Sequence, residues 1–203
     1  MRSRFLSLLL LALFSLTLRA QQQKDSIIAE GGGPDERASA RILYWNRTKN
    51  AAAGQFAIDY GRPTWKKEYE NKAKFEEMTR GKVWRLGKDF WTVLDTAIPL
   101  KIGGRDIPAG AWYLGLHRSD DGAVWSLAFI DPSKIRKTGL DAFEINRAPI
   151  EFRIPVTSSQ AETAADKLTV TLSAKESDIK DVTLKILWGK LQVSAPVQAV
   201  PKN

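Results

Sequence analysis

Residues 182–193 read VTLKILWGKLQV, and this stretch decides the fold class. Large apolar side chains occupy every second position, at Val182, Leu184, Ile186 and Trp188. Successive side chains of a β-strand point to opposite faces of the sheet, so this spacing predicts a strand with one buried face. The pattern resumes after residues 189–190, at Leu191 and Val193.

The same alternation recurs along most of the chain after residue 40. Further short strands are predicted at 55–60, 82–86, 90–95, 98–102, 111–117, 124–131, 150–154 and 168–173. Gly103 and Gly104 are typical of a two-residue hairpin turn, and residues 119–122 of a tight turn. Many short strands separated by turns predict a mostly β fold, a single antiparallel β-sandwich or barrel-like domain.

Helical sequence is a minor part of the chain. Residues 64–79 are rich in Lys and Glu and contain no Gly or Pro, so we expect one short surface helix there. Its apolar side chains, Trp65 and Tyr69 among them, fall on one side. Residues 131–134, Asp-Pro-Ser-Lys, have the composition of a short helical turn.

The N-terminal residues have the features of an export signal. Arg2 and Arg4 precede an apolar run at residues 5–18, which is shorter than the roughly 20 residues of a spanning helix. We therefore expect a signal peptide at 1–20, cleaved after Ala20, with an uncleaved membrane tether as the alternative. The mature protein is expected to be periplasmic or extracellular, with no integral membrane span.

The segment that follows the leader is polar. Residues 21–40 include the run Gly31 to Pro34 and too few large apolar side chains to form a core, so they predict a disordered linker. The β domain is then expected at 41–200, long enough to bury a core of its own.

Composition excludes several classes of function. The chain has no cysteine, which rules out disulfides, thiolate metal sites and a lipid anchor on an N-terminal cysteine. Its net charge of +8 falls to +5 when Arg2, Arg4 and Arg19 leave with the leader. The remaining basic residues are scattered among acids, so the sequence gives no indication of nucleic-acid binding.

Four segments resemble a known family in their order and spacing. They are IDYGRP at 58–63, GKVWRLG at 81–87, KIGGRDIPAGAWYL at 101–114 and the strand pair that ends in LWGKLQVS at 187–194. Residues 54–197 thereby resemble DUF2911, a family of exported bacterial domains of unknown function. The resemblance implies an exported β-rich domain and implies no particular activity.

The first and second of these segments contain the candidate ligand-binding residues. They are Asp59, Tyr60, Arg62, Trp84 and Arg85. Two arginines beside an aromatic ring can hold a carboxylate or phosphate with paired N–H donors while the ring packs below. The alternative is structural, with Asp59 pairing with Arg62 or Arg85 and Pro63 ending an edge strand. No catalytic residue is identified.

The other chemical groups give weaker indications. His117 is the only histidine, ends a predicted strand beside a turn, and is expected to face solvent or to form a local hydrogen bond. We predict no metal site and no cofactor. Of the seven tryptophans, Trp125 and Trp188 are expected in the core, whereas an exposed one among Trp45, Trp65 and Trp91 would offer a platform for a sugar ring.

These observations favour an exported, non-enzymatic module that binds a glycan or a protein of the cell envelope. One alternative is an envelope hydrolase or isomerase that uses an arginine and acid pocket. A purely structural accessory module is the other. The sequence does not determine the oligomeric state.

Overall fold

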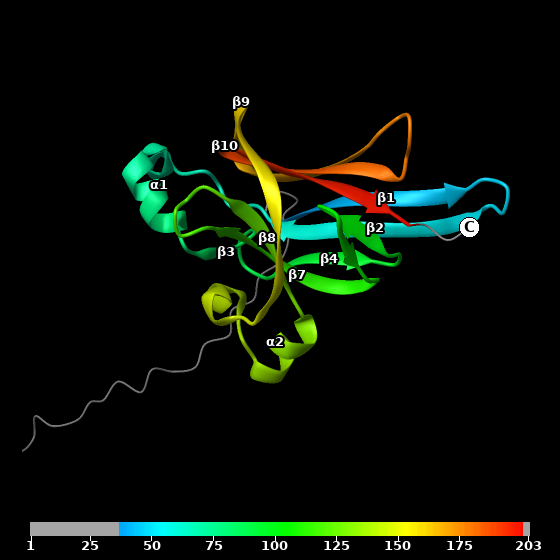
Figure 1. Cartoon of the computed structure of the whole chain (residues 1–203), viewed down its shortest axis with the longest axis horizontal. Coiled ribbons are helices and arrows are strands. Elements are labelled where there is room, and N and C mark those ends of the chain that lie inside the picture. Colours follow the sequence, from blue (N-terminus) through cyan, green and yellow to red (C-terminus); the bar gives the residue numbers. More distant parts are fainter. Residues whose placement is uncertain (1–36, 201–203) are drawn as a thin grey trace, which may run out of the picture. The chain divides into compact units, whose positions relative to one another are not determined.

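The structure is a computed structural model that describes residues 37–200. It contains one antiparallel sheet of ten strands (Figure 1). The strands are β1 (Arg37–Asn46), β2 (Ala51–Gly61), β3 (Val83–Arg85), β4 (Thr92–Thr96), β5 (Leu100–Ile102), β6 (Arg105–Ile107), β7 (Gly110–Arg118), β8 (Trp125–Ile130), β9 (Ile150–Ala174) and β10 (Asp181–Ala199). The prediction of a mostly β, antiparallel fold is confirmed.

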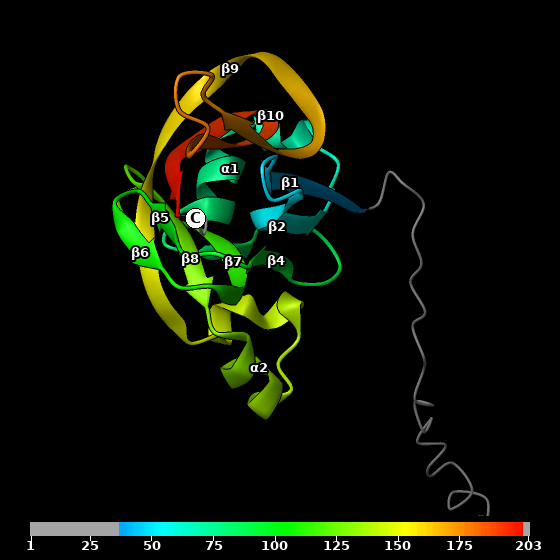
Figure 2. The same ribbon diagram turned by 90° about the vertical axis from the view of Figure 1, so that its right-hand side faces the viewer.

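Two long strands fold the sheet over its own core. The strand order is β1-β2-β4-β7-β8-β9-β10-β5-β6, and the short β3 pairs with the end of β7. The first part of β9 pairs with β8 and the rest pairs with β10. Figure 2 shows β9 and β10 arching over the core on the side opposite β4 and β7. The sheet therefore has a barrel-like arrangement, one of the two arrangements that the sequence left open.

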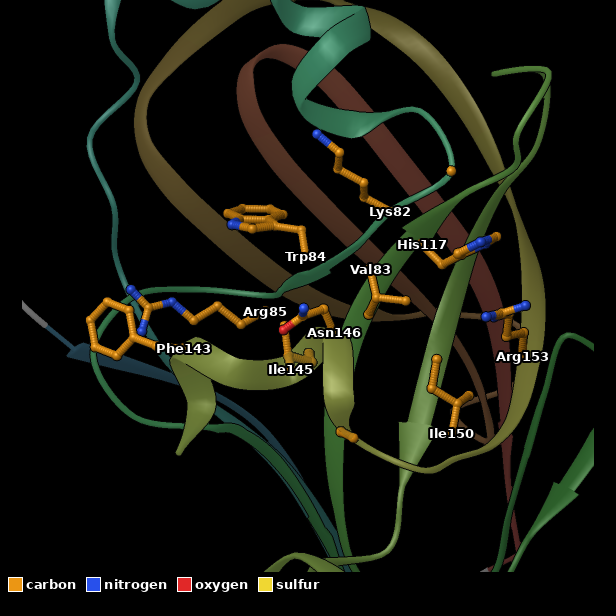
Figure 3. Close-up of a pocket in the computed structure, with 12 residues that line it drawn as sticks. Lys82, Val83, Trp84, Arg85, His117, Phe143, Ile145, Asn146, Ile150 and Arg153 are labelled. Carbon is orange, nitrogen blue, oxygen red and sulfur yellow. The ribbon is translucent and has the colours of Figure 1, made fainter. Parts of the chain in front are cut away.

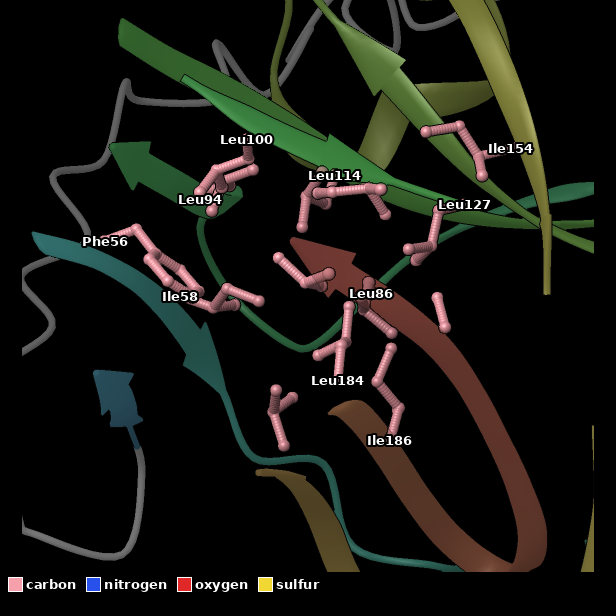
Figure 4. Packing of buried hydrophobic residues seen from close by; sticks show 14 of the residues in the cluster. Phe56, Ile58, Leu86, Leu94, Leu100, Leu114, Leu127, Ile154, Leu184 and Ile186 are labelled. Atoms are coloured by element: carbon pink, nitrogen blue, oxygen red, sulfur yellow. The ribbon is translucent and has the colours of Figure 1, made fainter. Parts of the chain in front are cut away.

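The apolar side chains at alternating strand positions fill the interior of the fold. Val182, Leu184 and Ile186 are all buried, and the strands facing them add further leucine, isoleucine and phenylalanine side chains (Figure 4). The core residues labelled there are Phe56, Ile58, Leu86, Leu94, Leu100, Leu114, Leu127, Ile154, Leu184 and Ile186. Removal of apolar surface from water, worth about 25 cal/mol per Å², is the main stabilising term for such a core.

Both predicted turns are present. Gly103 and Gly104 join β5 to β6 with φ angles of +54° and +85°, which a residue with a side chain rarely adopts. Two successive positive φ values match the twist of the flanking strands in a two-residue hairpin. The turn between β7 and β8 closes with the N–H of Gly122 donating to the carbonyl of Ser119 at 2.8 Å.

The first strand begins inside the range that we predicted to be a linker. β1 starts at Arg37 and pairs with β2 over its whole length, and it was absent from the predicted strands. Ala38, Ala40 and Ile42 pack against the core. The alternation is present in the sequence, but small alanines next to a polar, Gly-rich segment weaken it.

The predicted surface helix is shorter than expected. Helix α1 spans Lys72–Thr79, with the Asn71 side chain accepting from the N–H of Lys74 as its N-cap. A 3-10 turn, η1 (Lys67–Glu70), precedes it. The N–H of Trp65 donates to the carbonyl of Asp166 at 2.6 Å, and Thr64 forms a β-bridge with Lys167. These contacts with β9 hold residues 64–66 extended, so the helix cannot begin there.

Two short helical segments pack on the outer face of the sheet. Helix α2 (Pro132–Thr138) starts where the sequence predicted a helical turn, with Asp131 as its N-cap. A 3-10 helix, η2 (Ala142–Arg147), follows it. Ile135 and Ile145 pack with Ile130 of β8 in a small second apolar cluster, outside the main core. A cleft lined in part by Val83, Ile145 and Ile150 lies beside this cluster.

Residues 1–36 and 201–203 lie outside the described part of the chain, so the signal peptide at 1–20 and most of the segment at 21–40 remain predictions. Within residues 37–200, no helix has the length and apolar character needed to cross a membrane.

Candidate functional site

Two of the five candidate residues fasten the end of β2 to β9. The Tyr60 side chain is buried, and its hydroxyl accepts from the N–H of Val170 at 3.0 Å. The Nε–H of Arg62 donates to the carbonyl of Leu168 at 3.2 Å. Both side chains are therefore engaged with the backbone of β9.

Asp59 lies on the outer face of β2 and forms an ion pair with Arg37 of β1. The guanidinium of Arg37 also donates to the carbonyl of Trp91 at 3.4 Å. An ion pair within the fold is the structural alternative that the sequence left open, but the predicted partners, Arg62 and Arg85, were wrong. Arg37 takes their place because β1, a strand that the sequence did not predict, pairs with β2.

Trp84 and Arg85 are consecutive residues of β3 and so point to opposite faces. The Trp84 ring stacks on Trp188 with centroids 4.7 Å apart, among the aromatic side chains at the edge of the core. The Arg85 guanidinium lies over the Phe143 ring at 3.7 Å, and one N–H donates to the carbonyl of Asp89 at 2.9 Å. The structure thus keeps Arg85 and Arg62 in separate environments.

Arg85 and part of Trp84 line a cleft on the outer face of the sheet, beneath η2 (Figure 3). Its volume is about 740 Å³, within the range of roughly 300–1,000 Å³ typical of small-molecule sites. We call it the outer cleft. Its charged and polar lining residues are Lys82, Arg85, His117, Asn146 and Arg153.

Strand register explains how these residues meet. Arg85 of β3 pairs with Gly115 of β7, which pairs with Ala128 of β8, which pairs with Arg153 of β9. Residues paired in this way share one face of a sheet, so the four form a row across four strands. The two middle members are small, and the two end members are arginines.

Gly115 makes room for η2. A Cβ atom at this position would lie 2.9 Å from the Cδ1 atom of Ile145 and 3.0 Å from a methyl group of Val83. Both distances are closer than ordinary van der Waals contact, so the absent side chain lets η2 dock on the sheet. The docking of η2 carries Phe143 and Asn146 to the cleft.

The outer cleft is basic. None of its lining residues is Asp or Glu. Arg153 is exposed, and among residues 37–200 no carboxylate pairs with it. The acid two positions before it, Glu151, is bonded to Lys134 at 2.6 Å. The ammonium of Lys82 donates to the Glu77 carbonyl of α1 at 2.6 Å, at the rim of the cleft.

His117 lies beside Arg153 in this cleft (Figure 3). Burial lowers the pKa of its imidazole, the positive charge of Arg153 lowers it further, and Asp120 acts in the opposite direction. The net shift is downward from the ordinary value of 6.5. The imidazole is therefore neutral at pH 7, and protonation adds a positive charge to the cleft.

The tryptophans divide as the sequence predicted for the core. Trp125 and Trp188 are buried, and Trp45 is 53% exposed near the tip of the β1–β2 hairpin. Trp65 and Trp91 are half-buried, with Trp65 edge-on to Trp188 and Trp91 stacked on Tyr113 at 4.8 Å. No face of the described region gathers several exposed tryptophans.

Comparison with protein families adds one assignment. Residues 46–197 match the family model DUF2911, whose description is a protein of unknown function. The chain belongs to DUF2911. The matched range contains every residue that lines the outer cleft, which is therefore part of the DUF2911 domain itself. No curated protein and no solved structure matches the chain.

Sequence reasoning missed three charged or polar residues of this DUF2911 cleft, namely Lys82, Asn146 and Arg153. The alternation at 150–154 does predict that Arg153 points away from the core. The sequence does not reveal that β9 lies two strands from β7, which is what brings Arg153 beside His117. Among the described residues, no group of three or more histidines and acids is placed to hold a metal ion.

Proposed function

We propose that this DUF2911 protein is a binding protein whose outer cleft takes ligands with carboxylate, phosphate or sulfate groups. The observation that carries the proposal is the lining of the cleft, which offers Lys82, Arg85 and Arg153 and no carboxylate. Positive groups gathered in a concave site attract anions and raise their local concentration.

The geometry of Arg85 supports this proposal. The flat guanidinium rests on the Phe143 ring at 3.7 Å, and its bond to the Asp89 carbonyl at 2.9 Å further restricts its motion. Arginine presents paired donors that match a carboxylate or phosphate, and holding the fork still lowers the entropy cost of binding. Asn146 adds an amide that can donate or accept.

Binding is favoured over catalysis by the side chains at hand. The cleft lining contains no Asp, Glu, Ser, Thr or Tyr. An envelope hydrolase or isomerase built here would rely on His117 as its base. Asp59, the acid of the arginine and acid hypothesis, is paired with Arg37 and does not line the cleft.

The biological setting remains the one that the N-terminal sequence predicts, an exported protein of the periplasm or cell exterior. Acidic glycans belong to that setting and carry the required carboxylates. We therefore propose an acidic glycan as the first class of ligand to test, before a protein partner with an acidic segment.

A thermal-shift screen of the purified protein tests the proposal. The compounds are sugar acids, small carboxylates, phosphate and sulfate, with neutral sugars as negative controls. A ligand at one hundred times its dissociation constant stabilises the folded state by about 2.7 kcal/mol. We expect anions to raise Tm and Arg153→Ala to reduce the shift.

The matched control is Arg47→Ala, which removes an exposed arginine from the β1–β2 turn and leaves the cleft intact. It should respond to anions as the wild type does. If anions raise the Tm of both variants equally, they bind elsewhere. If no anion shifts the wild type, the binding proposal fails and the structural module gains support.

A further inference from the structure

The two arginines of the outer cleft stand at its two ends, and Lys82 lies at its rim. In Figure 3 the Arg85 guanidinium lies by Phe143 on one side, and Arg153 lies with His117 on the other. Val83, Ile145 and Asn146 occupy the space between them, and none of these carries a charge. A single small anion therefore reaches one end at a time.

Strand register sets the separation. Arg85 and Arg153 are the end members of the row through Gly115 and Ala128. Neighbouring strands lie about 4.8 Å apart, so three gaps place the two arginine backbones on the order of 14 Å apart. The residues between them in this row, Gly115 and Ala128, carry no charge. Each arginine therefore forms a separate anion subsite.

We propose that the natural ligand is an elongated molecule with at least two acidic groups, one held by Arg85 and the other by Arg153, with an uncharged stretch over Val83 and Ile145. This inference rests on the proposed function and narrows its ligand class. An oligosaccharide with repeated uronic acid residues has this form, because its carboxylates recur along a neutral sugar chain.

Linking two anions in one molecule raises affinity through effective concentration. Once one carboxylate is bound, the second is held near its own arginine, which multiplies affinity without any new contact. The gain vanishes when the ligand is too short to reach both ends. A rise in affinity once the ligand reaches a certain length would therefore indicate two subsites.

The experiment is calorimetric titration of the full chain with galacturonic acid and with its dimer, trimer and tetramer. Fully methyl-esterified trimer and tetramer, which lack the charges, are the matched ligand controls. We expect weak binding of the monomer, at least a tenfold gain in affinity at the trimer or tetramer, and no binding of the esters.

Variants assign the two subsites. Arg153→Ala and Arg85→Lys should each reduce the affinity of the long oligomers to that of the monomer, and combining them should abolish binding. Arg85→Lys keeps the charge and loses the flat stacking group, which limits any effect on folding, and Arg47→Ala is the control. Circular dichroism of each variant verifies the fold.

The possible results separate the two proposals. Equal affinity for every length of oligomer overturns the two-subsite inference and leaves anion binding intact. Binding of phosphate or sulfate with no galacturonate binding also overturns the inference alone. If no anion of any kind binds the folded protein, both proposals fall.

Discussion

His117 is the one group in the outer cleft whose charge changes near neutral pH. Its pKa lies below 6.5, chiefly because of burial and also because of Arg153, while Asp120 opposes the shift. Lowering the pH therefore protonates it and adds a positive charge beside Arg153. We expect the affinity for sulfate, which stays dianionic, to rise as the pH falls below 6.5.

Calorimetric titration with sulfate at several pH values measures this rise, and His117→Gln is the control that should give a flat profile. In the absence of ligand, lowering the pH is expected to reduce the stability of the folded protein. The unfolded chain takes up the proton first, so the free energy of unfolding should fall as the pH drops below about 6.5. A sulfate affinity that does not change as the pH falls over the whole range in which the protein stays folded would contradict the placement of His117.

Gly115 is the position where a single methyl group tests the architecture of the cleft. The new Cβ of Gly115→Ala would lie 2.9 Å from Ile145 and 3.0 Å from Val83, so η2 must shift outward. We expect a loss of about 1–3 kcal/mol in unfolding free energy, the usual cost of overpacking, together with weaker anion binding. Chemical denaturation measures the first effect and titration the second.

The matched control is Ala111→Val, at an exposed position of the same strand. It should change neither the unfolding free energy nor the anion affinity appreciably. If Gly115→Ala bound anions with unchanged affinity, the position of η2 would not matter for the site.

The substitution Tyr60→Phe tests whether Tyr60 has a structural role or a ligand-binding role. Tyr60→Phe removes the hydroxyl that accepts from the N–H of Val170, and a hydrogen bond of this kind contributes about 1 kcal/mol net. We expect lower stability in urea denaturation and unchanged anion affinity, because the side chain is buried away from the cleft. A loss of affinity at full stability would restore Tyr60 as a ligand-binding residue.

At the scale of elements, helix α1 lies at the surface of the described region. None of its residues is buried, and one of its polar anchors is the ion pair between Glu76 and Arg118 at 2.8 Å. The hydrogen bond from Arg118 is the main cause that lowers the pKa of Glu76. The anchor therefore stabilises the helix above the ordinary pKa of glutamate and is lost as the pH falls through the lowered value.

We expect Glu76→Gln to speed amide hydrogen exchange at residues 72–79 while Tm changes little, since local opening need not involve the core. Mass-spectrometric exchange measures both regions in one experiment. The neighbouring Glu77→Gln alters an exposed side chain and should leave the exchange rates unchanged. Equal protection in all three proteins would show that apolar contacts such as those of Phe75 hold the helix.

At the scale of the whole molecule, β9 joins the two halves of the sheet, because it pairs first with β8 and then with β10. A single core fills the space between them. We therefore expect residues 37–200 to unfold cooperatively, with coincident transitions by tryptophan fluorescence and far-UV circular dichroism. Leu127→Ala, at a fully buried position, should shift both transitions together and cost about 2–5 kcal/mol.

The control is Leu43→Ala, which makes the same substitution at an exposed position. It should change the free energy of unfolding only slightly. Two separate transitions in the wild type would mean that the halves joined by β9 have independent stability.

The sequence by itself determined the fold class, the positions of most strands and both glycine or aspartate turns, because these depend on neighbours along the chain. Alternation at 182–188 identifies a half-buried strand whatever its partner is, and Gly103-Gly104 identifies a hairpin from local sterics. It also placed Trp125 and Trp188 in the core. The weak alternation of β1 and the extended backbone at 64–66 escaped it, because contacts with other strands stabilise both.

Only the tertiary structure decided which side chains share a site. Asp59 and Arg62 stand close to Tyr60 in sequence, yet one pairs with Arg37 and the other with the carbonyl of Leu168. Arg85 and Arg153 lie far apart in sequence and share one row of the sheet. The physical reason is that period-two alternation fixes the face on which a side chain lies, whereas strand order and register fix its neighbours, and these follow from packing of the whole core.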